Sequence, residues 1–277
     1  MIDHDSHVHT AFSTDSDEPM EQMVKQAVRA GLRGITFTDH MDYNFPQAFN
    51  QDDTDPSPFT FDLEQYLAQI GRLEKIYGSQ VRIYRGVELG LKRDAVERNM
   101  ALSRDSRLDY IIGSIHLVDD IDPYFPQYWD TFGEKAGITA YFETALQNVQ
   151  DARVPIDTFG HLDYIVRYAP SGNRFYSYRM YAELIDEILR VIVTRGISLE
   201  VNTSGYKNGG TMPNPNEDII RRYRELGGES VTFGSDAHTA GLLAARFADA
   251  ETIVRNAGFD HYVTFTGHKP TFHKFES

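Results

Sequence analysis

The sequence predicts a single α/β barrel of parallel strands. A helical stretch that ends in glycine, a short link and an apolar β run recur six or seven times, and most runs end at an ionisable residue. The 277 residues, 41% of them apolar, suffice for one such barrel. In these barrels the carboxyl ends of the strands carry the chemistry. An open doubly wound sheet is the competing topology, but the sequence has neither GxGxxG nor GxxxxGK[ST].

The first β–α unit supplies the clearest signals. His7 and His9 are two residues apart in a predicted strand, so both imidazoles face one side and could share an ion. The following helix shows an apolar period of 3.6 residues, at Met20, Met23, Val24, Ala27 and Val28. We expect Asp17 to cap this helix and Gly31 to end it. The next strand, 34–38, leads to His40.

The same order recurs along the rest of the chain. A helix over 63–77 stops at Gly78, and the strand 81–87 ends at Glu88. Further strands are expected at 110–115, 156–159, 197–201, 231–233 and 262–265. The acidic, proline-containing stretch 41–61 follows a strand end, which predicts a lid or specificity loop.

The composition limits the chemistry. Without cysteine, the chain has no disulfide, Fe–S cluster, thiolate zinc site or cysteine nucleophile, so any metal must be held by His, Asp and Glu. Since 41 acidic residues face 27 basic ones, the net charge of −14 opposes a nucleic-acid or anionic-membrane binder. No signal-peptide pattern or long apolar run is present, which predicts a cytoplasmic protein. The sequence gives no indication of the oligomeric state.

Nine ionisable side chains stand at or just past predicted strand ends. They are six of the ten histidines and three carboxylates, namely His7, His9, Asp15, His40, Glu88, His116, His161, Asp236 and His238. Packed at one rim without cations, they would repel one another or lose their hydration, so the set predicts a metal centre. The other four histidines, His4, His261, His268 and His273, are expected to be surface or packing residues.

The order of these motifs resembles that of the polymerase and histidinol phosphatase (PHP) family. The matching segments are His7-Val8-His9, Thr38-Asp39-His40, Glu88, Gly113-Ser114-Ile115-His116, Gly160-His161-Leu162-Asp163 and Ser235-Asp236-Ala237-His238. Within the family, the length of the chain and the segments 161–167 and 200–205 look like those of the histidinol-phosphate phosphatases.

The resemblance implies a distorted (β/α)7 barrel, a single domain over 1–277, with two to three divalent ions (Zn, Mn or Fe). It implies a first site of His7, His9, Glu88 and Asp236, a second of Glu88, His116 and His161, and a third of Asp15, His40 and His238. The carboxylate Asp15 replaces the histidine of other members, which slightly favours Mn or Fe there.

The implied activity is hydrolysis of L-histidinol phosphate in histidine biosynthesis, with Glu88, Asp236 and His238 as catalytic residues. Two adjacent ions activate water, neutralise phosphate oxygens and align the attack, so no Ser or Cys nucleophile is needed. A rim Asp or His or a metal-bound water could protonate the leaving group.

Three further residues are expected to bind this small phosphate ester. Arg167 and Lys207 follow predicted strand ends and could clamp the phosphate, although either could simply be a solvated surface charge. Asp42, the acidic residue of the 41–61 stretch nearest to His40, could meet the cationic groups of histidinol.

Three alternatives remain. Other members of the family cleave nucleic-acid ends or phosphotyrosine, but the net charge opposes the nucleic-acid version. A non-catalytic metal-stabilised module would be expected to have lost ligands, and all nine are present. Metal-dependent amidohydrolases also open with HxH, but usually carry a carboxylated lysine where this chain has Glu88.

Overall fold

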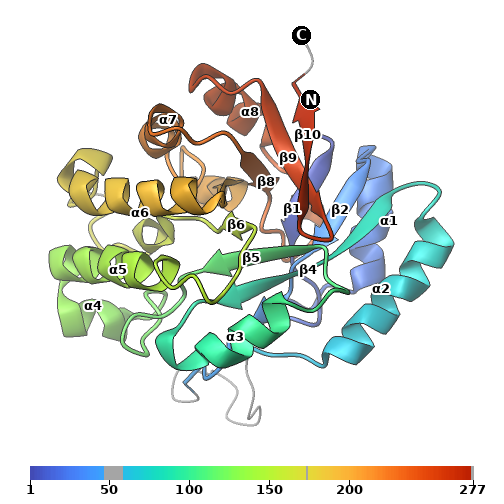
Figure 1. Ribbon diagram of the computed structural model, residues 1–277, viewed down its shortest axis with the longest axis horizontal. Coiled ribbons are helices and arrows are strands. Elements are labelled where there is room, and N and C mark those ends of the chain that lie inside the picture. The colour runs from blue at the N-terminus through green and yellow to red at the C-terminus, as the bar shows by residue number, and fades with distance from the viewer. Residues whose placement is uncertain (47–58, 173, 276–277) are drawn as a thin grey trace.

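Seven parallel strands form a nearly closed barrel in the computed structural model, which describes residues 1–46, 59–172 and 174–275 (Figure 1). In spatial order the strands are β1 (His4–Val8), β2 (Gly34–Phe37), β4 (Arg82–Gly90), β5 (Tyr110–Ser114), β6 (Thr158–Phe159), β7 (Ser198–Asn202) and β8 (Val231–Gly234). The short β3 (His40–Met41) also pairs with β4. At the seam, Val8 pairs in parallel with Ala237, beside β8. The predicted parallel barrel is therefore confirmed.

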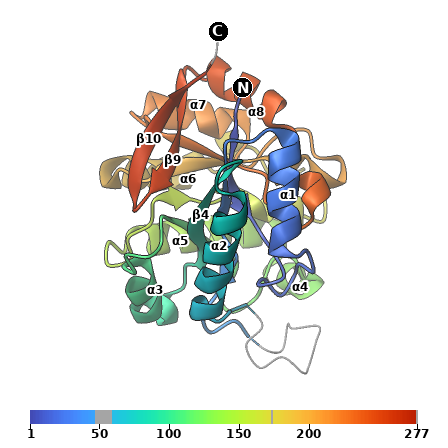
Figure 2. The same ribbon diagram turned by 90° about the vertical axis from the view of Figure 1, so that its right-hand side faces the viewer.

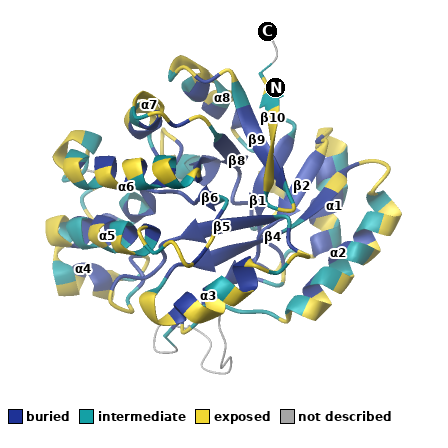
Figure 3. Ribbon diagram, in the orientation of Figure 1, coloured by how far each residue is buried: buried dark blue, intermediate teal, exposed yellow. Residues whose placement is uncertain are grey.

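Helices surround the barrel and turn their buried faces toward it (Figure 3). They are α1 (Met20–Ala30), α2 (Leu63–Tyr77), α3 (Val96–Ser103), α4 (Pro126–Phe132), α5 (Glu134–Val149), α6 (Ala182–Arg195), α7 (Glu217–Glu225) and α8 (Phe247–Asn256). The 3-10 turns are η2 (Arg93–Ala95), η3 (Tyr164–Arg167), η4 (Tyr178–Met180), η5 (Thr203–Gly209) and η6 (Ala240–Leu242). No helix in the described ranges is long and apolar enough to cross a membrane.

The prediction for the ends of α1 is right at its carboxyl end and wrong at its amino end. Gly31 ends α1 in the left-handed conformation, with φ of 73°, as expected. Asp17 does not cap the helix, because Pro19 itself occupies the N-cap position and no side chain bonds the first free N–H groups. The cap prediction for Asp17 is therefore wrong.

The strand predicted near 262–265 does not extend the barrel. It is β9 (His261–Thr266), which pairs antiparallel with β10 (Lys269–Lys274). Gly267 and His268 link the two strands, and both have positive φ (52° and 61°), as a two-residue hairpin turn requires. Although α8 precedes β9 as a crossover would, β9 is paired with β10 and not with a barrel strand.

The β9–β10 hairpin covers the amino-terminal end of the barrel (Figures 1 and 2). The ring of Phe265 stacks on that of Tyr110, the first residue of β5, with centroids 5.3 Å apart. The Gly267 N–H donates to Asp109 Oδ1 over 3.0 Å, just before the same strand. The four histidines that we expected to lie apart from the metal centre are all in β1 or this hairpin. The carboxyl ends of the strands are thus left for the chemistry.

Candidate metal centre

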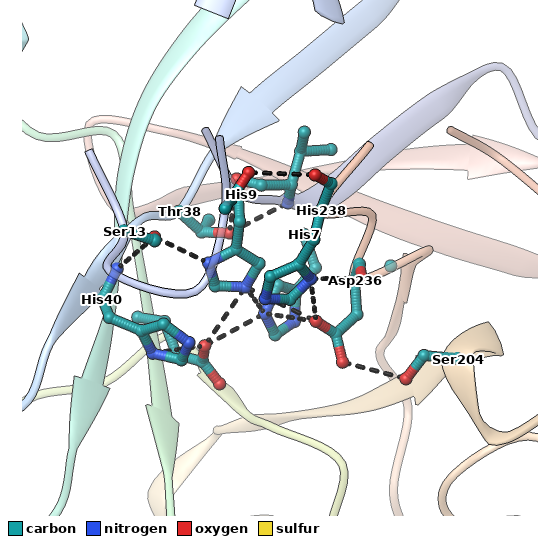
Figure 4. Close-up of polar contacts among 12 residues, drawn as sticks. His7, His9, Ser13, Thr38, His40, Ser204, Asp236 and His238 are labelled. Atoms are coloured by element: carbon teal, nitrogen blue, oxygen red, sulfur yellow. Dashed lines mark hydrogen bonds and ion pairs between the residues drawn. The ribbon is translucent and has the colours of Figure 1, made fainter. Parts of the chain in front are cut away.

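The predicted ligands converge at the carboxyl end of the barrel. Figure 4 shows five of them with their side chains pointing toward one another: His7, His9, His40, Asp236 and His238. Four overlapping groups could each hold an ion, with ligand atoms within 4.8 Å of one another. They are His7, His9 and Glu88; Glu88, His116 and His161; His9, Asp15, His40 and His238; and His40, Asp42 and His116. The ninth predicted ligand, Asp236, lies beside them, with Oδ1 3.5 Å from His9 Nε2.

Two imidazole nitrogens face each other at the first group. His7 Nε2 lies 2.9 Å from His9 Nε2, and both rings are fully buried. Glu88 Oε2 lies 3.2 Å from the former nitrogen and 3.4 Å from the latter. At most one proton fits between the two nitrogens, so their lone pairs are oriented to bind a cation beside the carboxylate.

Glu88 divides its two oxygens between two sets of histidines. While Oε2 faces the first group, Oε1 lies 2.9 Å from His161 Nε2 and 3.2 Å from His116 Nε2. Oε1 also accepts the Ser114 hydroxyl over 2.6 Å, which fixes the rotamer. A carboxylate in this position could serve two ions, one beside each set of histidines.

The third group lies nearer to solvent. His238 Nε2 is 3.0 Å and His40 Nε2 is 3.5 Å from Asp15 Oδ2. The ring of His238 stacks on that of His9 at 4.2 Å, so this group adjoins the first one. His238 Nδ1 contacts the Asp236 carbonyl at 3.0 Å, which places the proton on Nδ1 and leaves Nε2 free as a ligand.

Hydrogen bonds behind the cluster orient the histidines. His7 Nδ1 donates to Glu200 Oε1 over 2.5 Å, and His116 Nδ1 donates to Asp42 Oδ2 over 2.6 Å. Carboxylates in this position fix the tautomer of a metal-binding histidine and increase its basicity. Sequence reasoning assigned no role to Glu200, although a glutamate inside the predicted strand 197–201 was a usable signal.

The pKa values of two neighbouring histidines in the cluster are shifted in opposite directions. Burial opposes a charge on His7, yet Glu200, Glu88 and Asp236 raise its pKa well above 6.5. Burial lowers the pKa of His9 well below 6.5, and neighbouring histidines add to the effect. Protonation is favoured at one buried ring and opposed at the next. Metal cations would therefore stabilise this set better than protons do.

Unpaired buried atoms also fit bound ions. His40 Nδ1 and Asp42 Oδ1 are buried without a hydrogen-bond partner. They lie 4.0 Å apart, and the first is 3.2 Å from Glu88 Oε2. Buried polar atoms are rarely left unpaired, so an ion held between these two atoms would supply the missing partner.

Comparisons with known proteins agree with this geometry. The family model of the PHP domain matches residues 5–204. The chain belongs to the PHP family. This membership confirms the resemblance seen in the sequence motifs.

PHP proteins named as histidinol phosphatases are similar over nearly the whole chain. A probable histidinol-phosphatase of Clostridium acetobutylicum is 33% identical over 91% of this chain and 92% of its own. The histidinol-phosphatase of Lactococcus lactis is 31% identical over 96% of this chain and 95% of its own. The crystal structure of a histidinol phosphate phosphatase from Lactococcus lactis, complexed with Zn, L-histidinol and phosphate, has a TM-score of 0.87 at 28% identity and covers 97% of this chain and 98% of that one.

A cavity of about 370 Å³ opens onto the cluster of predicted ligands. Its wall includes Arg167, which donates to Asp236 Oδ2 over 3.2 Å and to Asn214 Oδ1 over 2.7 Å. Arg167 is 17% exposed and lies beside the predicted ligand Asp236, while its predicted role as a phosphate clamp stays a prediction.

The structure gives the other two predicted substrate residues different partners. Lys207 Nζ donates to the main-chain oxygen of Asp236 over 2.9 Å and is not part of the cavity wall. Asp42 touches the wall, but one oxygen bonds His116 and the other is buried. One oxygen of Asp42 thus serves His116, and a role of Asp42 toward a substrate cation stays a prediction.

The predicted lid over 41–61 lies mostly outside the described residues, which omit 47–58. Its two described flanks border the cavity, where the rings of Phe45 and Phe59 pack 4.3 Å apart. The Asp42 N–H donates to the Phe59 carbonyl over 2.7 Å and ties the flanks together. The lid itself stays a prediction.

Proposed function

We propose that this protein is a metal-dependent phosphomonoesterase that hydrolyses L-histidinol phosphate to L-histidinol and phosphate. The observation that carries the proposal is the position of Glu88, whose two oxygens serve two histidine pairs below a cavity that also holds Arg167. The relatives named above support the substrate. The net charge of −14 favours a small substrate over a nucleic acid.

The ligand sets are part of the same proposal. His7, His9, Glu88 and Asp236 hold the first ion, Glu88, His116 and His161 the second, and Asp15, His40 and His238 the third. All ligand atoms are nitrogen or oxygen, which suits Zn, Mn or Fe. The sites face the cavity, which leaves coordination positions for water and substrate.

The chemistry follows from these positions. When bound, the divalent ions supply the Lewis acidity that activates water and neutralises phosphate oxygens. Arg167 offers its guanidinium to a phosphate oxygen, while its bond to Asp236 fixes its direction. Glu200 and Asp42 keep the protons of His7 and His116 on Nδ1, so that each Nε2 stays free as a ligand.

The three proposed catalytic residues act through the cluster. Glu88 and Asp236 keep their negative charge, because neighbouring cationic groups outweigh burial and hold the pKa of each carboxyl well below its usual value. His238 Nδ1 donates a hydrogen bond to the Asp236 carbonyl, so its Nε2 is available as a ligand.

Phosphate release from histidinol phosphate tests the proposal. Protein stripped by chelator should be inactive, and Zn or Mn should restore it. Glu88→Gln should reduce the rate by at least roughly 10³-fold, because it weakens two sites at once. Glu183→Gln, an exposed residue of α6, is the matched control and should leave the rate unchanged. Cleavage of another monoester but not of histidinol phosphate would disprove the substrate and keep the reaction class.

A further inference from the structure

Arg167, the proposed phosphate clamp, is held at each of its nitrogens. Nε donates to Asn214 Oδ1 over 2.7 Å, Nη1 to Asp236 Oδ2 over 3.2 Å, and Nη2 to Asn202 Oδ1 over 3.2 Å. Since each terminal nitrogen of a guanidinium carries two N–H groups, these bonds leave one N–H on each within the described part of the chain. The bond at Nε is the shortest, and because the group is planar, it sets the plane in which the remaining pair points.

Asn214, the partner of Nε, is a buried amide on a fixed main chain. Its N–H and carbonyl exchange two hydrogen bonds of 2.8 Å with those of Asn202, at the end of β7. Asn214 is 4% exposed, and its Nδ2 donates to Asp163 Oδ1 over 2.6 Å. An amide presents an oxygen on one side and an NH₂ group on the other. Only one of its two orientations therefore fits between the donor at Arg167 and the acceptor at Asp163.

Asp163 is the buried acceptor of this arrangement, and it is 1% exposed. It is not among the described residues that line the cavity or form the four ligand groups. It precedes η3, which carries Arg167, but its side chain does not cap that turn. Besides the amide of Asn214 at Oδ1, it accepts three donors at Oδ2: Tyr176 Oη over 2.9 Å, and Asn216 N and Nδ2 each over 3.2 Å. Donors thus meet both oxygens, which a carboxylate accepts and an amide cannot.

We infer that Asp163 is a positioning residue, which acts through the amide of Asn214 to fix the direction in which Arg167 presents its remaining N–H groups to phosphate. The inference rests on the proposed function and adds to it a residue outside the cavity wall. With an acceptor at Asp163, Asn214 turns its oxygen toward Arg167. With a donor there, the amide turns round and sets its NH₂ group against Nε, so the guanidinium loses its closest anchor.

Asp163→Asn makes this change at nearly constant volume. Because three donors meet Oδ2 and one meets Oδ1, the new amide keeps its oxygen toward Tyr176 and Asn216 and turns its NH₂ group toward Asn214. Calorimetry on the metal-loaded full-length protein should show binding of inorganic phosphate weakened by about tenfold. Asp218→Asn removes an exposed carboxylate from the first turn of α7, and this matched control should bind phosphate as the wild type does.

Coupling to Arg167 separates positioning from a general loss of structure. Arg167→Ala should itself weaken phosphate binding, and adding Asp163→Asn to it should then change the affinity by less than about twofold. Equal losses with and without Arg167 would mean that Asp163 acts only on the local fold, which overturns the inference. An unchanged phosphate affinity of Arg167→Ala also overturns it, because there would be no clamp to position.

Exchange of the two side chains is a test by rescue. In the double variant Asp163→Asn/Asn214→Asp, the amide at position 163 donates to the carboxylate at position 214, which again offers an oxygen to Arg167 Nε. The phosphate affinity should return to within about threefold of the wild type. A double variant with full metal content that binds phosphate no better than Asp163→Asn overturns the inference. If Asp163→Asn does not fold, Asn214→Ala leaves Asp163 its other three donors and should weaken phosphate binding by about tenfold.

These measurements need no turnover. A wild type that binds phosphate but releases none from histidinol phosphate would defeat the proposed function, while the phosphate affinities of the variants still decide the role of Asp163. A metal-loaded Asp163→Asn protein with the wild-type affinity for phosphate overturns the inference and leaves the proposed function intact.

Discussion

Replacing Glu200 by glutamine tests how far the residues behind the ligands control the metal centre. Glu200 is 1% exposed and accepts three hydrogen bonds, from His7 Nδ1 (2.5 Å), the His161 N–H (2.7 Å) and Asn202 Nδ2 (3.1 Å). Glutamine has one acceptor oxygen, so its NH₂ group must face either His7 or the His161 N–H. One buried donor is then unpaired.

The size of the effect follows from that unpaired donor. A buried unpaired donor costs about 1–3 kcal/mol. Loss of the partner behind a metal-binding histidine typically weakens metal binding by about 10–100-fold, or about 1.4–2.8 kcal/mol. The two estimates overlap, so we expect Glu200→Gln to raise the Kd for Zn by about 10–100-fold.

The assay is competition for Zn with a fluorescent chelator, alongside phosphate release at increasing Zn. Activity of the variant should recover largely in excess Zn, because Glu200 does not face the substrate. Glu183→Gln, exposed on α6, should match the wild type in both assays. A folded Glu200→Gln protein with the wild-type Kd would refute the reasoning that this carboxylate orients His7.

Three further predictions concern the same pocket. Arg167→Ala should lower kcat/KM by about 10²-fold and weaken competitive inhibition by inorganic phosphate to a similar extent, since it removes a buried charged donor; unchanged phosphate inhibition would argue against the clamp. Asp42→Asn should lower metal content and reduce activity on histidinol phosphate and its des-amino analogue in equal ratio, because Asp42 orients His116; selective loss of the amine substrate would restore the role that the sequence suggested. Burial opposes the charge on His40, but Asp15 and Glu88 raise its pKa to about 9, above the ordinary 6.5. Its protonation therefore stabilises the metal-free fold fully below pH 6.5 and is lost as the pH rises toward 9. Metal binding needs the neutral ring, so the increase in Tm caused by Zn should grow as the pH rises across this window. Melting curves with chelator and with Zn measure this difference in Tm, and a difference that does not change with pH would contradict the reasoning.

Much of the metal centre was predictable because strand ends in a parallel barrel share one rim. The spacing of His7 and His9 suggested a shared ion, the other ionisable residues at strand ends strengthened that prediction, and Glu88 followed from its place after an apolar run. The register of the short β3 with β4 then sets His40 directly opposite Glu88, which no sequence pattern indicated. The set of side chains was thus predictable, whereas their pairing depended on strand register.

The residues behind the ligands were not predictable in the same way. Asp42 and Asp122 are both acidic and both near strand ends, yet one bonds His116 and the other faces the cavity. That difference depends on how loops fold over the rim. The β9–β10 hairpin was also missed, because its apolar run is like that of the barrel strands and only the two-residue link at Gly267 marks the reversal.

The hairpin under the barrel has a kinetic consequence. Because it packs against the amino-terminal end of β5, the cavity that reaches the ligand cluster, as far as the described residues define it, lies at the carboxyl end, and we expect the ester to enter and both products to leave there. If phosphate binds at Arg167, which is 17% exposed, and the alcohol lies toward Tyr124, which is 53% exposed, we expect histidinol to depart first. Phosphate would then compete with fresh ester for the vacated enzyme, and turnover should respond to the phosphate level of the surroundings more than to that of the alcohol.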